Sequence, residues 1–229
     1  ESGYNTARIF VVGRWFENPG ISGSYENDGL YAPYMDNVVD FIRRAKKYGI
    51  YVFPTFCDGE LPRNKRYWNI IKDAMEGLKI DDVTIRSHNA IFVTPKGQQA
   101  RTLYITDFFS YIKEKDASLL NTLIAVQCQN ELTLNGAQWP FTLTKGDFTG
   151  PEGKVYDMSN DDQRHALYQN SILSYHARIA KAVKKSGKVL SEVQPFWVED
   201  LGSKNGTIVS GECVERKALA NGDVLQFGS

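Results

Sequence analysis

Two short apolar runs joined by an amphipathic segment constrain most strongly how this chain can fold. Residues 6–12 (TARIFVV) and 50–56 (IYVFPTF) are rich in β-branched and aromatic residues, which is typical of buried strands. Between them, Pro33 is placed to begin a helix and Gly49 to end it. One helical face is apolar throughout, with Met35, Val38, Val39, Ile42 and Ala45. We therefore predict a βαβ unit whose two strands are parallel.

The alternation of apolar runs and helical segments continues after an excursion at residues 57–99. An apolar stripe that includes Tyr104, Phe108, Tyr111 and Ile112 predicts a second helix. Residues 119–128 follow as an apolar run that is too short to be another helix.

The next part of the chain predicts a turn-rich segment and then a long helix. Residues 132–158 are rich in Gly, Thr and aromatic residues and indicate a loop that carries a hairpin. The sequence Ser159-Asn-Asp-Asp162 is a capping-box pattern for a helix that ends at Gly187, and residues 188–193 are suited to a further strand.

The predicted order is therefore β-α-β-α-β-α-β, with the long insertions after strands rather than after helices. Active sites of β/α barrels are built from such loops, so we predict an α/β fold that is a partial or complete (β/α)8 barrel. A flavodoxin-like open sheet is the main rival, although no Gly-rich phosphate loop follows the first strand.

Composition excludes several classes of function. The 27 basic residues balance the 27 acidic ones, which argues against a broad nucleic-acid or membrane surface. The three cysteines are far apart, so we expect no disulfide framework, and Cys57 and Cys128 are interpreted as buried apolar residues. The three histidines have no ligand spacing, and we expect neither a metal nor a cofactor.

Polar residues gather where the apolar run 119–128 ends. Residues 127–132 read Gln-Cys-Gln-Asn-Glu-Leu, which places Asn130 and Glu131 at the carboxyl end of a predicted strand. A Glu in a partly apolar pocket can hold a proton and give it to a glycosidic oxygen, and the neighbouring Asn can bind a sugar hydroxyl. Taken alone, the Asn-Glu pair is more typical of the exposed start of a loop.

Three segments together resemble the first half of a TIM-barrel glycoside hydrolase of the cellulase and endo-β-mannanase clan. They are NTARIFV at 5–11, FIRRAKKYGIYVFP at 41–54 and AVQCQNEL at 125–132. The resemblance implies that Arg8 supports the catalytic carboxylates, Asn130 contacts the sugar and Glu131 is the general acid/base. It implies retaining hydrolysis of β-mannan or β-glucan, with a second carboxylate as the nucleophile; Glu192 is the candidate, although its position suits strand five rather than strand seven.

Aromatic residues on the predicted post-strand loops are candidates to stack on sugar rings. Trp15 and Trp139 are the first of these, with Trp68 and Phe141 beside them, and the alternative is that they pack the loops themselves. A polysaccharide or oligosaccharide is the expected partner, with neither nucleic acid nor membrane, and the substrate class suits an extracellular location. The first residues, Glu-Ser-Gly-Tyr, have neither a basic flank nor an apolar stretch, so we do not expect them to be a signal peptide.

The final residues have a different pattern. Residues 197–211 read as a strand, an Asn-Gly turn and a strand, and 218–228 add another turn and strand. This short all-β segment is similar to the C-terminal half of a forkhead-associated (FHA) domain, a β-sandwich that binds phosphothreonine. The resemblance implies that Ser203 and Asn205 lie on phosphopeptide-binding loops. The Gly-Arg and Ser-x-x-His segments of that family are not visible, so we expect no phosphoprotein partner.

The sequence therefore predicts two parts, a glycoside hydrolase-like portion at 1–194 and an FHA-like segment at 195–229. We expect a junction between these two parts near residues 190–197. A fusion of two genes, an incomplete gene or an engineered chain would each produce such a junction. Besides an active hydrolase, two alternatives stay open: an inactive carbohydrate-binding remnant, and a phosphothreonine-peptide-binding module.

Overall fold

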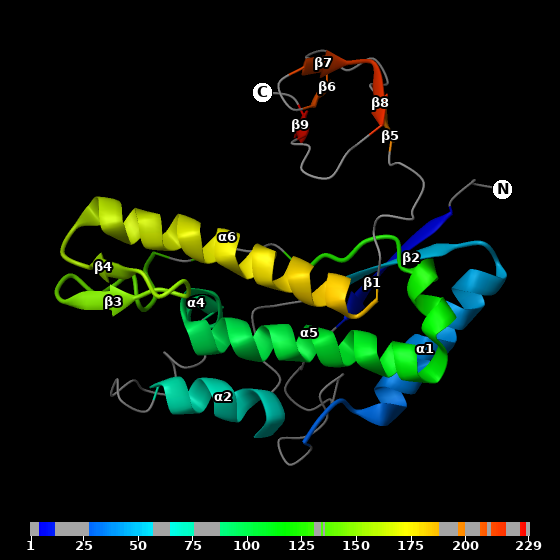
Figure 1. Cartoon of the computed structure of the whole chain (residues 1–229), viewed down its shortest axis with the longest axis horizontal. Coiled ribbons are helices and arrows are strands. Elements are labelled where there is room, and N and C mark those ends of the chain that lie inside the picture. The colour runs from blue at the N-terminus through cyan, green and yellow to red at the C-terminus, as the bar shows by residue number, and fades with distance from the viewer. Residues whose placement is uncertain are drawn as a thin grey trace. The chain divides into compact units, whose positions relative to one another are not determined.

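The computed structural model divides the chain into two compact units, residues 1–188 and 189–229 (Figure 1). The residues that the structure describes are 5–11, 28–56, 65–75, 88–130, 134, 136–187, 197–199, 207–209, 212–218 and 225–227.

The first unit begins with the predicted βαβ arrangement. Strand β1 (Thr6–Val11) pairs in parallel with β2 (Tyr51–Phe56), in a register that runs from Thr6 opposite Tyr51 to Val11 opposite Phe56. Helix α1 (Ala32–Lys47) connects them and buries the five residues of its predicted apolar face. Gly49 follows the helix with a φ of 67°, a left-handed conformation that favours glycine. The predicted unit of two parallel strands and a connecting helix is confirmed for the described residues 6–11 and 32–56.

A third segment lies along β2, but it differs from the expectation for residues 119–128. Its first part is a 3₁₀ helix, η2 (Ala117–Thr122), because the Asp116 carboxylate accepts a hydrogen bond from the Ser118 amide at 2.9 Å and caps that turn. The chain then becomes extended, and Leu123 and Gln127 form parallel bridges to Val52 and Thr55 of β2. Within the described residues, the parallel sheet thus holds two strands and one bridged segment, and closure into a barrel stays a prediction.

The described residues between 57 and 116 form the helices α2 (Lys65–Met75), α4 (His88–Val93) and α5 (Pro95–Asp116). The predicted second helix, with Tyr104 and Ile112, is part of α5. The Thr94 side chain caps α5 by accepting a hydrogen bond from the Gly97 amide at 3.0 Å. Helix α2 is tied to α5 by Arg66, which binds both oxygens of Asp107 at 2.5 and 2.9 Å, and the Tyr67 hydroxyl donates to the same carboxylate at 2.7 Å.

A hairpin and a long helix complete the first unit. Strands β3 (Asp147–Thr149) and β4 (Val155–Asp157) are antiparallel, as expected for a hairpin within residues 132–158. Helix α6 (Asp161–Lys185) packs against α4, α5 and β4. No helix in the described part of the chain is long and apolar enough to cross a membrane.

The start of α6 differs by one residue from the predicted capping box. Ser159 donates its hydroxyl to the Asp157 carboxylate at 2.6 Å and is therefore engaged outside the helix. Asn160 takes the capping position, and its side-chain oxygen accepts from the Gln163 amide at 3.1 Å. The Gln163 side-chain oxygen accepts a hydrogen bond from the Asp157 amide at 2.8 Å, which links the start of α6 to the end of β4.

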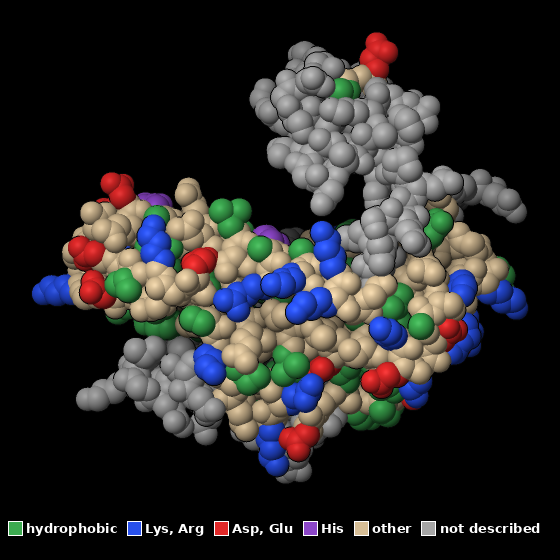
Figure 2. All heavy atoms as spheres, in the orientation of Figure 1, with side chains coloured by type: hydrophobic (Ala, Val, Ile, Leu, Met, Phe, Trp, Pro, Cys, Tyr) green, Lys and Arg blue, Asp and Glu red, His purple; other side chains and the backbone are tan. Residues whose placement is uncertain are grey.

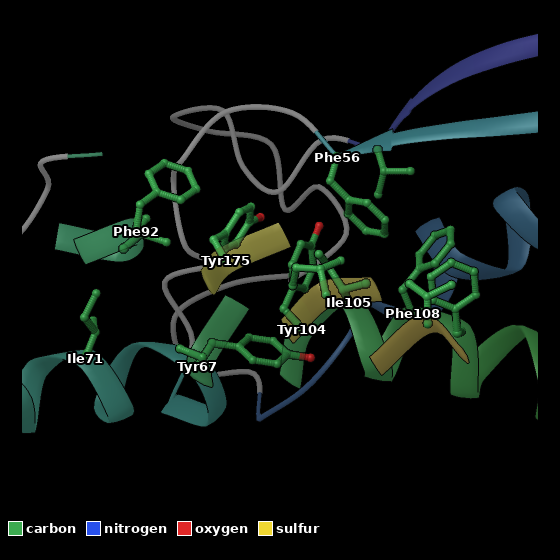
Figure 3. Packing of buried hydrophobic residues seen from close by; sticks show 14 of the residues in the cluster. Phe56, Tyr67, Ile71, Phe92, Tyr104, Ile105, Phe108 and Tyr175 are labelled. Carbon is green, nitrogen blue, oxygen red and sulfur yellow. The ribbon is translucent and has the colours of Figure 1, made fainter. Parts of the chain in front are cut away.

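Aromatic side chains from five elements form the centre of the core (Figure 3). Phe56 at the end of β2 meets Tyr104 and Phe108 of α5 edge to face, with ring centroids 5.7 and 5.1 Å apart. Tyr67 of α2 packs on Tyr104 at 5.5 Å, and Phe92 of α4 packs on Tyr175 of α6 at 4.8 Å. Such pairs stabilise the fold beyond their buried area and fix the angles at which the helices meet.

The second unit contains short antiparallel strands. Strand β5 (Trp197–Glu199) pairs with β8 (Arg216–Ala218), and β6 (Thr207–Val209) pairs with both β7 (Glu212–Val214) and β9 (Leu225–Phe227). Strands lie at the positions predicted on either side of the Asn-Gly turn and near the chain's end, as β5, β6 and β9. Strand β5 pairs with β8 rather than with β6, so these two strands do not form the hairpin that the turn predicts.

We expect Gly97→Ala to destabilise the first unit, because α4 and α5 meet too closely for a side chain at this position. A Cβ atom there would lie 2.5 Å from the Ala90 carbonyl oxygen and 2.6 Å from that of Ile91. Relief of this overlap should cost about 3 kcal/mol in the free energy of unfolding, measured by urea denaturation with helical circular dichroism. Gly136→Ala, where nothing lies within 4 Å, is the control. Equal stability of the two variants would contradict the packing described here.

Candidate functional site

A network of hydrogen-bonded polar side chains lies at the carboxyl end of the parallel segments. Arg8 of β1 donates through Nε to the Thr55 hydroxyl at 2.8 Å, and through Nη2 to the Gln127 side-chain oxygen at 2.8 Å and the Asn130 side-chain oxygen at 2.9 Å. The Thr55 hydroxyl also donates to the Gln127 oxygen at 3.2 Å. One guanidinium thereby joins three segments that are far apart in the sequence.

The parallel pairing brings these residues together. The Phe56 amide donates to the Gln127 carbonyl at 2.9 Å, and the Asn130 amide donates to the Phe56 carbonyl at 3.0 Å. The chain after the third segment therefore stays against the end of β2. Asn130 follows the carboxyl end of the third segment, as the sequence predicts. Arg8 lies in the middle of β1 and reaches Asn130 through its side chain, and the glycoside hydrolase resemblance assigns it to the same site.

Arg8 fixes the orientation of the Asn130 amide. The Asn130 oxygen accepts from the guanidinium, so its NH₂ group points away from Arg8. Within the described residues, that NH₂ group donates no hydrogen bond and can serve another group. The Arg8 guanidinium itself lies over the Phe10 ring at 4.6 Å. The arrangement can donate hydrogen bonds to an oxygen-rich ligand.

A second layer, centred on the fully buried Arg101 and Tyr175, holds the turn that carries Asn130. The Tyr175 hydroxyl of α6 donates to the Cys128 carbonyl at 2.8 Å and accepts from Arg101 Nε of α5 at 3.3 Å. Arg101 Nη2 donates to the Gln129 side-chain oxygen at 3.1 Å, and the Gln127 side-chain nitrogen donates to the Gln129 carbonyl at 3.1 Å. Residues 127–130 are thus held from both sides.

Burial changes the acidity of two groups in this layer. It raises the pKa of Tyr175 to about 12, so this hydroxyl stays protonated and able to donate at neutral pH. Burial also raises the pKa of the Cys128 thiol, although the nearby Arg101 acts in the opposite direction. Cys128 is therefore protonated and packed against the core, which agrees with its interpretation as an apolar residue rather than a nucleophile.

Of the residues proposed from the sequence, Arg8 and Asn130 are brought together. Those that lie outside the described residues are Glu131, Trp15, Glu192, Ser203 and Asn205. Glu131 directly follows Asn130 in the chain, and Ser203 and Asn205 fall between β5 and β6. Their proposed roles stay predictions.

Trp139 packs within the loop that contains it. Its ring meets Phe148 of β3 edge to face, with centroids 5.4 Å apart, and it lies half-buried against the core. Phe141 packs in a similar way on Tyr168 of α6, at 5.6 Å. This is the packing alternative that the sequence left open, and a sugar platform at Trp139 stays a prediction.

Sequence reasoning missed four members of the site: Thr55, Gln127, Arg101 and Tyr175. Gln127 lies inside the motif already singled out, three residues before Asn130, and this position was the available signal. Arg101 and Tyr175 lie in helical stripes where a polar residue looks like an interruption of the apolar face. In the described ranges, no group of three or more His, Cys, Asp or Glu residues is placed to hold a metal ion.

Comparison with known families identifies one match. The family model of the FHA domain matches residues 159–228. Neither the curated proteins nor the solved structures contain a significant match to this chain. The match supports the FHA part of the sequence-based resemblance, and no comparison supports the glycoside hydrolase part. It also argues against the expectation that no phosphoprotein is bound.

The matched range extends further towards the N-terminus than the segment 195–229 expected from the sequence. Residues 161–185 of the match form α6, which packs in the first unit, whereas strands β5 to β9 form the antiparallel pairs of the second unit. The β-strands that a sandwich fold requires are therefore confined, among the described residues of the match, to residues 197–227.

We expect Tyr175→Phe to loosen the turn at residues 127–130. The change leaves the buried Cys128 carbonyl and the Arg101 Nε without the partner that joins them, which should lower the free energy of unfolding by about 1–3 kcal/mol. Urea denaturation measures this, and Tyr168→Phe on the same helix is the matched control. Faster amide exchange at residues 127–130 in the Tyr175 variant alone is expected, and unchanged exchange and stability would contradict the proposed support.

Proposed function

We propose that the C-terminal part of the chain binds phosphothreonine-containing peptides. The observation that carries this proposal is the FHA family match over residues 159–228. The antiparallel pairs β5–β8 and β7–β6–β9 within that range are compatible with the β-sandwich class to which such domains belong.

The chemistry of the connection between β5 and β6 suits a phosphate. Its sequence, Gly202-Ser-Lys-Asn-Gly-Thr207, supplies a hydroxyl at Ser203, an ammonium at Lys204 and an amide at Asn205. A phosphate carries close to two negative charges at neutral pH and accepts several charge-assisted hydrogen bonds. We assign Ser203 and Asn205 as donors to the phosphate and Lys204 as the cation that compensates its charge.

Phosphate-dependent binding is the direct test of this function. The full chain should bind a fluorescein-labelled phosphothreonine peptide in an anisotropy titration and should not bind the same peptide with unmodified threonine. Asn205→Ala should weaken binding by about tenfold or more, the value of one hydrogen bond to a charged group. Asn37→Ala, on the exposed face of α1, is the matched control. Affinity that is independent of the phosphate, or unchanged by Asn205→Ala, would refute the proposal.

We propose hydrolysis of β-linked glycans as a second candidate function, located in the first unit. The observation that favours it is the 2.9 Å hydrogen bond between Arg8 and Asn130 at the carboxyl edge of the parallel segments. It orients the Asn130 amide to donate to a sugar hydroxyl, and Glu131 follows directly in the chain.

The mechanism would be retaining. Glu131 protonates the leaving glycosidic oxygen while a second carboxylate, about 5 Å away, attacks the anomeric carbon and forms a glycosyl ester. Glu131 then removes a proton from the water that hydrolyses this ester. The second carboxylate is unassigned, and Glu192 is the first residue to test.

Reducing-sugar release from soluble β-mannan and β-glucan tests the second candidate. Release by the full chain should fall by at least about 100-fold in Glu131→Gln, because the amide cannot protonate the leaving group. Glu114→Gln, at an exposed position of α5, should leave release unchanged. No release by the unmodified chain would reject the hydrolase while leaving phosphopeptide binding untouched.

A further inference from the structure

A groove lies between the β3–β4 hairpin and the outer face of α6. Its volume is about 640 Å³, within the range of pockets that bind ligands. The helix contributes Asn170, Leu173, Ala177 and Lys181, residues three or four apart that share one face. The groove is distinct from the Arg8 network, and neither proposed function uses it.

The floor of the groove is apolar. The Leu173 side chain is 68% exposed there. A partner that lies over the groove would bury this apolar side chain. Ala177 continues the apolar strip, and Tyr156 of β4 forms the base, fixed by a hydrogen bond from the Asn170 amide to its hydroxyl at 2.9 Å.

Basic side chains surround this floor. Lys154 lies over the Tyr156 ring at 5.0 Å, Arg178 holds the hairpin through the Pro151 carbonyl at 3.0 Å, and Lys181 lines the far side. Glu152 is the one acidic residue of the lining. None of the three cations forms an ion pair within the part of the chain that the structure describes.

The positive charge extends beyond the groove. A second hollow, of about 500 Å³, continues along the helix and shares Ala177 and Lys181 with the first, adding Lys184 and Lys185. Figure 2 shows the row of Lys and Arg side chains over the C-terminal half of α6. The helix contains no acidic residue after Asp162.

The helix dipole explains only part of this charge. Lys184 and Lys185 lie in the last turn, where cations are favourable next to free carbonyl groups. Lys181 and Arg178 lie one and two turns earlier, and Lys154 is on the hairpin, so this effect does not account for them. Their common feature is that they surround an exposed apolar strip.

From this arrangement we infer that the groove is a docking site for an acidic peptide segment that inserts an apolar side chain over Leu173 and Ala177. The carboxylates of the peptide would pair with Lys154, Arg178 and Lys181, and the acidic stretch would continue towards Lys184. The unbalanced positive charge selects an acidic partner, and the apolar floor selects a peptide side chain rather than charge alone.

The lining argues against nucleic acid as the partner. Single-stranded nucleic acids stack their bases on exposed aromatic rings. The aromatic residue of this groove, Tyr156, is only 1% exposed and lies beneath the Lys154 ammonium. The groove therefore provides the charge for a phosphate backbone without a surface for its bases.

Fluorescence anisotropy with the full chain tests the docking site. The probe is a fluorescein-labelled, Glu- and Asp-rich peptide with a central Leu-Leu pair and no phosphothreonine, so that its binding is separate from the proposed FHA function. We expect saturable binding that weakens about fivefold in Lys181→Glu, as for loss of one exposed ion pair, and weakens similarly in Leu173→Ser. Arg43→Glu makes the same reversal of charge on α1, away from the groove, and this variant should bind the peptide as tightly as the unmodified chain does.

Three outcomes would overturn the inference. The first is no saturable binding of the peptide. The second is equal binding when Ser-Ser replaces the Leu-Leu pair, which would mean that charge alone attracts the probe. The third is tighter binding of a single-stranded oligonucleotide of equal charge. Circular dichroism of the Lys181 and Leu173 variants verifies their fold, since both positions are exposed and neither change should unfold the helix.

Discussion

The first unit is arranged around one buried guanidinium. Arg101 is fully buried, and a cation in that position is tolerated only when hydrogen bonds and nearby electron-rich groups compensate for the lost water. Tyr175 and the Gln129 side chain accept its hydrogen bonds, and the ring of Tyr104 lies 5.3 Å from its charge. These partners come from α6, from the turn after the third parallel segment and from α5 itself. The contacts of Arg101 therefore hold α6 and that turn against α5.

The same arrangement explains why the turn at residues 127–130 can position side chains. Arg101 and Tyr175 hold the inner side of the turn, while Arg8 holds Gln127 and Asn130 on its outer side. A ligand-binding amide needs such support, since its own rotamer is otherwise free. The geometry thereby gives the second candidate function a physical basis that the family comparisons do not supply.

Helix α6 shows why the FHA match and the compact units have different boundaries. Leu167, Tyr175 and Ile179 on its inner face are buried in the core of the first unit. Separation of the helix from this unit would expose them, so α6 belongs to the first unit although the FHA match includes it. The phosphopeptide proposal therefore concerns the part of the match that contains the strands at 197–227. The outer face of the same helix carries Leu173 and Lys181, which line the groove. Because residues three or four positions apart share one face of a helix, α6 can bury one face in the core and expose the other to a partner.

The amino-acid sequence was sufficient to predict the βαβ arrangement of β1, α1 and β2 and the position of Asn130 after the third segment. Strand periodicity, Pro33 and Gly49 predict the β1–α1–β2 unit that the structure contains. The glycoside hydrolase resemblance implies that Arg8 and Asn130 belong to one site, and in the structure their side chains are hydrogen-bonded. The partners of Arg101 and the groove on α6 follow from the tertiary structure alone. Each of these depends on which residues from distant elements meet, through hydrogen bonds and packing that no periodicity along the chain encodes.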